Sequence, residues 1–308
     1  MLEATAFSPA GITSFFEIRD KRPDGRPFKD LAYAGARGGG LVTSRGILTR
    51  VRLIPASKSR ISIRINGCQA PRARTSLSTI SELLKISRQK YRVTADHRAQ
   101  VPIGAGYGAS AAGALSAAVA FSEAADLGMS MDQLGTVAHL AEIRNGTGLG
   151  TVGPILRGGF VLTRKSGGPG IAVIDRILVS PRLRVVSACF GPISTKAVLA
   201  SKDLRRKVNV LGLSAFESIT RDLRPRNFMT ASRAFADTLA LMSRETAELA
   251  DLMENAGAIG ATQNMLGQAV HAIAEEDQAE SILRIVRRRF PKIQAFSCRL
   301  DFIGARIV

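Results

Sequence analysis

Alternating apolar and polar residues predict strands through the first half of the chain. From residue 61 to residue 65, isoleucine takes every second position, with serine and arginine between. That period of two is typical of a strand with one buried face. Shorter apolar runs predict further strands at residues 15–19, 48–53, 91–95 and 160–164.

Apolar residues three or four positions apart predict helices between these strands. Residues 77, 80, 83 and 84 are apolar, which predicts a helix over 77–86. Another helix is predicted over 131–143, where Ser130 is suited to cap its start. An alanine-rich run without proline predicts a third over 110–125.

The second half of the chain has more helical patterns and fewer strands. We predict helices at 196–211, 227–242, 246–255, 265–274 and 279–289, and strands at 171–174, 184–189, 295–300 and 305–308. Residues 166–170, Ser-Gly-Gly-Pro-Gly, combine flexibility with a proline break. We therefore expect an α+β protein with two lobes, residues 1–168 and 169–308.

Composition is consistent with a folded, reduced protein. The chain has 308 residues, of which 45% are hydrophobic, so it can bury a large core. Its three cysteines are far apart and form no metal-binding pattern, which is typical of reduced thiols. No basic leader and no long apolar stretch stands out. We expect a cytoplasmic protein without a membrane span.

A net charge of +18 raises the alternative of nucleic-acid binding. The densest basic clusters lie at residues 202–207, 221–226 and 284–289. Aromatic residues make up only 5% of the chain and tryptophan is absent, so side chains for base stacking are few. Solvated helix faces explain the charge more simply, and the charge would also steer anionic substrates toward a site.

A glycine-rich loop, Val-Pro-Ile-Gly-Ala-Gly-Tyr-Gly-Ala-Ser-Ala-Ala-Gly at residues 101–113, is the strongest functional signal. Gly104, Gly106 and Gly108 would let the backbone approach a ligand closely. The free N–H groups at the start of the following helix would favour an anion. The loop predicts a phosphate site, with ATP as the natural ligand. A tight structural turn before a small-residue helix would explain the loop alone equally well.

Other phosphate-binding loops do not fit this sequence. A P-loop needs Lys followed by Ser or Thr after its last glycine, and here Ala109 and Ser110 follow Gly108. The protein-kinase triplets His-Arg-Asp and Asp-Phe-Gly are absent from the chain. Neither class of nucleotide-binding protein is therefore indicated.

Three segments together resemble motifs of the GHMP small-molecule kinases, which include galactokinase, homoserine kinase and mevalonate kinase. They are residues 6–16, the loop at 102–112 and the glycine-rich stretch 257–267. The resemblance implies a GHMP architecture with an N-terminal lobe like the second domain of ribosomal protein S5 and a ferredoxin-like C-terminal lobe. It implies ATP bound along the loop, at Pro102, Gly104, Ala105, Gly106, Gly108, Ala109, Ser110 and Ala111.

Within the family the resemblance is strongest to members that phosphorylate pantoate on the archaeal route to coenzyme A. Residues 8–17, 35–40, 138–142, 147–152 and 191–196 carry it. It implies pantoate and ATP as small-molecule partners, and it makes a homodimer plausible. One alternative with the same fold is a kinase for another small hydroxy acid or polyol. An alternative from a different functional class is a catalytically silent relative that binds nucleic acid.

The resemblance also assigns roles to five residues. Ser110 and Glu142 would hold Mg²⁺ and form the catalytic pair, since a hard cation prefers oxygen ligands. His139, Arg164 and Thr195 would bind pantoate. Each has a plainer explanation. His139 and Glu142 share one helix face and would suit a half-buried pair, Arg164 would suit an exposed strand position, and Thr195 would suit a helix cap.

The chain departs from its relatives at three places. Thr151 stands where many relatives have an aspartate able to orient or deprotonate the attacking hydroxyl. Ala10 and Gly11 stand where many have Gly-His, and Gln263 stands where a small or apolar residue is usual. A threonine hydroxyl is no general base near neutral pH, so the identity of any base and of the substrate stays open.

Overall fold

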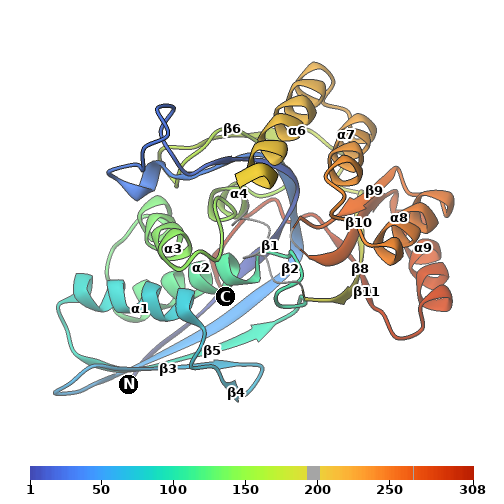
Figure 1. The fold of residues 1–308 in the computed structure, drawn as a ribbon. Coiled ribbons are helices and arrows are strands. Elements are labelled where there is room, and N and C mark those ends of the chain that lie inside the picture. Colours follow the sequence, from blue (N-terminus) through green and yellow to red (C-terminus); the bar gives the residue numbers. More distant parts are fainter. Residues whose placement is uncertain (193–201, 266) are drawn as a thin grey trace.

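A computed structural model describes residues 1–192, 202–265 and 267–308 (Figure 1). Its larger sheet is built on two long antiparallel strands, β1 (Leu2–Arg19) and β2 (Gly35–Pro55). The sheet has the order β12-β1-β2-β5-β3-β4. In addition, β6 pairs with β2, and β7 pairs with β6. The remaining strands are β3 (Arg60–Ile65), β4 (Cys68–Gln69), β5 (Tyr91–Ala99), β6 (Phe160–Lys165), β7 (Val173–Ile177) and β12 (Arg306–Ile307).

Strand β2 changes partner along its length, and glycines permit the change. Residues 38–41 pair with β6, whereas residues 47–55 pair with β5. A Cβ atom added at Gly40 would collide with the Ile12 carbonyl oxygen, and one at Gly39 would lie 2.7 Å from the Phe228 ring. The Gly38–Gly40 run therefore lets β1 and β2 bend together, because side chains there have no room.

Helices cover one face of this sheet (Figure 1). They are α1 (Arg74–Ser87), α2 (Ala109–Ala124), α3 (Met131–Asn145) and α4 (Val152–Arg157), with a short 3-10 turn at Leu31–Tyr33. Helix α2 packs on β1 and β2 and is buried along nearly its whole length, which its alanine content permits. Ser130 caps α3 in a reciprocal capping box with Gln133, so the predicted cap is confirmed.

The smaller sheet lies beside the larger one and has the order β11-β8-β10-β9. Its strands are β8 (Arg184–Gly191), β9 (Gly260–Gln263), β10 (Gln268–Ala274) and β11 (Gln294–Arg299). Helices α8 (Arg244–Asn255) and α9 (Glu276–Arg289) bury Leu249, Met253, Ile282 and Val286 against it. Helices α6 (Lys202–Arg221) and α7 (Pro225–Thr238) pack on β1, and α7 also contacts β9, so they connect the two parts of the molecule.

The structure overturns one sequence prediction and leaves another untested. The helix predicted at 265–274 was wrong, because β10 occupies Gln268–Ala274 and pairs with both β8 and β9. A strand buried on both faces shows no alternation of apolar and polar residues, so periodicity alone does not distinguish its apolar run from a buried helix. The lobe boundary at residue 168 stays a prediction, since β7 and β12 lie beyond it and still join the larger sheet. Within the described ranges, no helix has the length and apolar character needed to cross a bilayer.

Candidate active site

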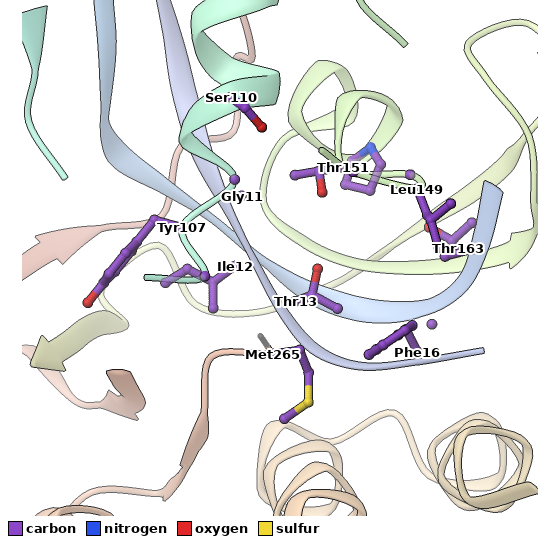
Figure 2. A pocket seen from close by; sticks show the side chains of 18 of the residues that line it. Gly11, Ile12, Thr13, Phe16, Tyr107, Ser110, Leu149, Thr151, Thr163 and Met265 are labelled. Carbon is purple, nitrogen blue, oxygen red and sulfur yellow. The ribbon is translucent and has the colours of Figure 1, made fainter. Parts of the chain in front are cut away.

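A cavity of about 430 Å³ lies between the bent β1–β2 pair and the start of α2 (Figure 2). Its walls come from these strands, the glycine loop, the turn after α3, strand β6 and Met265, which follows β9. The lining residues are Gly11, Ile12, Thr13, Phe15, Phe16, Ala36–Leu41, Ile103, Gly104, Gly106–Ser110, Gly146–Thr151, Pro154, Val161, Thr163 and Met265.

The glycine loop turns through left-handed backbone conformations that its sequence allows. Gly104, Gly106 and Gly108 have φ of +78°, +80° and +59°. A Cβ at Gly106 would lie 2.8 Å from the Cβ of Asn264, and one at Gly108 would lie 2.8 Å from the Gly11 carbonyl oxygen. Both close approaches require glycine, so the loop can pack against β1 and the second part of the chain at once.

Helix α2 begins at the cavity. Its cap residue is Gly108, so no cap side chain bonds to the N–H groups of its first turn. Of the residues predicted to hold a nucleotide, Gly104, Gly106, Gly108, Ala109 and Ser110 line the cavity. Pro102, Ala105 and Ala111 are not among the lining residues. The predicted phosphate loop and helix start therefore open onto one space, as an anion site requires.

Ser110 and Glu142 meet at this helix start. The Ser110 hydroxyl donates to Glu142 Oε1 over 2.7 Å, and Glu142 is 2% exposed. Thr147 donates to the same oxygen over 2.7 Å and also lies 2.9 Å from the Thr75 hydroxyl. Burial raises the pKa of the Glu142 carboxyl, and the two hydrogen bonds oppose that rise. A cation beside this carboxylate would favour its charged form.

Thr147 and Gly148 were not predicted as parts of this cluster. Helix α3 ends at Gly146 in the left-handed conformation, and the Thr147 N–H donates to the Glu142 carbonyl over 3.1 Å. Because the chain turns back at this helix end, the Thr147 hydroxyl lies within hydrogen-bond distance of the Glu142 carboxylate. A Cβ at Gly148 would collide with Glu142 Oε2. The Gly-Thr-Gly turn after a helical glutamate was the available signal, and its meaning depends on the three-dimensional turn.

Of the three residues predicted to bind substrate, the two that the structure describes do not line the cavity. His139 is buried, and its Nε2 donates to the Ala34 carbonyl over 3.0 Å; burial lowers its pKa. Arg164 lies outside the lining and pairs with Asp175 at 2.9 Å. Thr195 falls outside the described residues. Direct contacts of His139 and Arg164 with a substrate stay predictions, and neither side chain lines the cavity.

The second part of the chain closes the cavity through buried polar contacts. The hydroxyl of Tyr107, which lies on the lining, is 2.8 Å from the Ser187 hydroxyl on β8. The Met265 N–H donates to the Thr13 carbonyl over 2.9 Å. Gln263, an unusual residue for this motif, donates to the Leu241 and Gly267 carbonyl oxygens. Gln263 therefore supports the turn behind Met265 and does not reach into the cavity.

The lining is poor in charge. Thr151 lies on it, and a Cβ added at Gly108 would lie 2.7 Å from its methyl group. None of the described lining residues is Asp or Glu, because Glu142 lies behind Ser110 and Thr147. Arg37 alone among them carries a charge. Its place on the cavity wall was not predicted from the sequence.

Comparisons with known proteins agree with this geometry. Residues 76–159 match the family description GHMP kinases N terminal domain. The chain is 29% identical to a pantoate kinase of Thermococcus kodakarensis, over 91% of each protein. It is 24% identical to a pantoate kinase of Methanocaldococcus jannaschii, over 91% of this chain and 96% of that protein.

Solved structures share the fold. A phosphotransferase related to the CoA biosynthesis pathway superposes with a TM-score of 0.88 at 25% identity, over 100% of this chain and 99% of that one. A homoserine kinase from Cytophaga hutchinsonii gives a TM-score of 0.74 at 16% identity, over 100% and 98% of the two chains. The expected α+β GHMP architecture is confirmed.

Proposed function

We propose that this chain, which carries a GHMP kinase N-terminal domain and resembles archaeal pantoate kinases along nine-tenths of its length, is an ATP-dependent pantoate kinase. The reaction would convert (R)-pantoate and ATP into 4-phosphopantoate and ADP. The observation that carries the proposal is the open N-terminus of α2 beside the Ser110–Glu142 pair, in a cavity large enough for small ligands.

The cavity divides into two ends. We call Gly104, Gly106–Ser110 and Thr147 the phosphate end, and Thr13, Phe16, Arg37–Gly40 and Thr163 the acceptor end. In Figure 2, Ser110 lies at one side of the space, and Thr13 and Phe16 lie across from it. Triphosphate would bind at the first end and pantoate at the second, so that the γ-phosphate and the acceptor hydroxyl meet between them.

At the phosphate end, backbone N–H groups would bind the phosphate oxygens. The helix start supplies these donors, its cap residue Gly108 has no side chain to bond to them, and its partial positive charge favours the anion. The transferred group keeps negative charge on its oxygens throughout, so fixed donors stabilise the transition state. The loop glycines permit this approach because no Cβ lies between backbone and ligand.

Ser110 and Glu142 fit a magnesium ion. No group of three or more His, Cys, Asp or Glu side chains that could hold a metal exists among the described residues. A hydroxyl and one carboxylate leave most coordination positions to water and phosphate, which is how Mg²⁺ usually binds with nucleotides. Such an ion would neutralise phosphate charge. Thr147 would keep Glu142 Oε1 oriented toward Ser110.

In the transfer itself, the acceptor hydroxyl oxygen forms a bond to the γ-phosphorus as the bond from that phosphorus to the bridging oxygen of ADP breaks. The hydroxyl proton leaves late, to an oxygen of the transferred phosphoryl group or to water, because the transition state is loose and needs no strong nucleophile. Thr151 would hydrogen bond to the hydroxyl without removing its proton. Positioning and charge neutralisation would therefore supply most of the acceleration.

A substrate panel tests the proposal. Purified protein with ATP and Mg²⁺ is offered (R)-pantoate, homoserine, mevalonate or shikimate, and phosphorylated products are measured by mass spectrometry. We expect the highest kcat/KM for pantoate. Higher kcat/KM for another compound would favour a related kinase of small hydroxy acids, a possibility that Thr151 in place of aspartate keeps open. A cytoplasmic location and a homodimer remain expectations from the sequence.

A further inference from the structure

Arg37 is placed to contact whatever occupies the acceptor end. It lies on β2 directly opposite Glu17 on β1, one residue before the glycine run. Its side chain is 22% exposed, and among the described lining residues no other is charged. A single cation in a mostly apolar wall is a strong site for an anion, because little water competes with it.

The guanidinium is held on one edge and one face. Its Nε donates to Glu17 Oε1 over 2.5 Å, and its central carbon lies 4.3 Å from the centre of the Phe216 ring on α6. Glu17 is 1% exposed, and its other oxygen takes a hydrogen bond from Arg19 over 2.6 Å. One carboxylate thus serves two guanidinium groups, so the cluster keeps a net positive charge.

The outer edge of the Arg37 guanidinium remains available. Within the described residues, neither of its terminal nitrogens has a protein partner. Two parallel N–H groups on a planar fork match the two oxygens of a carboxylate. Since Glu17 and Phe216 already fix the group, little conformational entropy is lost when a ligand binds.

Arg164 offers a contrast on the neighbouring strand. Both its Nε and its Nη2 contact Asp175, at 3.0 and 2.9 Å, so this fork is already paired. The pairing of Arg164 therefore differs from that of Arg37, whose terminal nitrogens have no partner among the described residues.

We propose that Arg37 binds the carboxylate of the acceptor hydroxy acid, and thereby selects an acidic acceptor over a neutral one. The inference rests on the proposed function. With the carboxylate at Arg37, the rest of the acceptor would extend across the cavity toward Ser110 and the phosphate end, since both residues line the same space. The same contact lets the enzyme reject neutral diols, which would leave the guanidinium unpaired.

The test compares pantoate with pantoamide, its neutral amide, in three proteins. These are the wild type, Arg37→Gln, and the matched control Arg19→Gln, which removes the other cation on Glu17 from a residue outside the lining. We expect the wild type and Arg19→Gln to prefer pantoate by about 10- to 100-fold in kcat/KM, the range for a charged hydrogen bond. Arg37→Gln should lose that preference and keep its KM for ATP.

Two further measurements keep the outcomes distinct. Arg37→Lys retains a point charge without the fork and should keep part of the preference. Stabilisation of each variant by ATP and Mg²⁺ in thermal melts reports folding and nucleotide binding independently of the acceptor. If Arg37→Gln or Arg37→Lys binds ATP and keeps the full wild-type preference, the inference is wrong and the kinase assignment stands. If the wild type binds ATP and phosphorylates neither compound, the proposed function fails and the inference falls with it.

Discussion

The two ends of the cavity are built in different ways. The phosphate end uses backbone, glycines and one helix start, all within a short segment, with Glu142 and Thr147 added from α3 and its following turn. The acceptor end takes side chains from β1, β2 and β6. Triphosphate is common to many kinases, so a local backbone device suffices. An acceptor varies, and the side chains that select it come from distant segments.

Loss of the carboxylate at the phosphate end should have the largest effect. Glu142→Gln keeps an oxygen that accepts from Ser110 and Thr147 but removes the charge that a cation needs. We expect kcat to fall about 1,000-fold, as for loss of a strong electrostatic contact, with KM for pantoate nearly unchanged. Steady-state kinetics of this variant and of Glu123→Gln, an exposed change on α2, check it. Equal activity of the two variants would remove Glu142 from the mechanism.

A methyl group added at Gly106 in the glycine loop should have the second-largest effect, on ATP binding. In Gly106→Ala the new Cβ would meet Asn264 at 2.8 Å, at a φ of +80°. We expect about 5- to 150-fold weaker binding of a non-hydrolysable ATP analogue by calorimetry, from the roughly 1–3 kcal/mol typical of overpacking. Gly128→Ala is the control, since Gly128 also has positive φ but has open space around it. If both variants bind the analogue alike, close packing of the loop is unimportant.

Acid should loosen the support behind the phosphate end. His271 Nδ1 lies 2.9 Å from Asn264 Oδ1, and its Nε2 lies 2.8 Å from the Ser14 hydroxyl. Burial lowers the pKa of His271 to about 3 and that of His97 to about 4. Because both folded pKa values lie below the unfolded value near 6.5, the unfolded chain takes up protons first as pH falls.

The part of the free energy of unfolding that comes from keeping these two histidines neutral is therefore present above pH 6.5 and is lost as the pH falls below that value. Between pH 7 and pH 5 we expect each histidine to remove about 2 kcal/mol from the free energy of unfolding. Urea titrations at the two pH values measure this for the wild type, His271→Gln and His97→Gln. Each variant should show a pH dependence about 2 kcal/mol smaller. An unchanged pH dependence in His271→Gln would mean that His271 is not neutral in the folded protein.

A carboxylate restored at Thr151 should have the smallest effect. Thr151 packs its methyl group near Gly11 and Gly108, and aspartate would fill a similar volume. If positioning dominates, Thr151→Asp changes kcat less than tenfold, as does the uncharged control Thr151→Asn. Rapid-quench measurement of the transfer step checks this. A rise of 100-fold confined to the aspartate variant would show that proton removal limits the native protein.

The same contrast explains what the sequence could predict. The Ile61–Ile65 alternation, the Ser130 cap and the loop before α2 are local patterns, and the structure has each of them. Helix 265–274 failed because a strand buried on both faces has no local period. Contact between Ser110 and Glu142 was expected from the family resemblance, and the structure brings them together.

The role of Arg37 could not be read in the same way. In sequence it is an arginine before three glycines. Its importance appears only when Glu17, twenty residues earlier, and Phe216, on α6, are placed around it. Thr147 likewise depends on how α3 ends. Contacts between distant segments carry these side chains to the cavity, and no local pattern records them.

Transfer of labelled phosphate tests the central claim, that ATP at one end of the cavity phosphorylates a hydroxy acid at the other. Protein at stoichiometric concentration is mixed with ATP labelled at the γ-phosphate, Mg²⁺ and (R)-pantoate, and the label is followed through a single turnover. We expect the label to move to phosphopantoate and ADP to form in equal amount. Label that stays in ATP, or that appears only in inorganic phosphate, would contradict it.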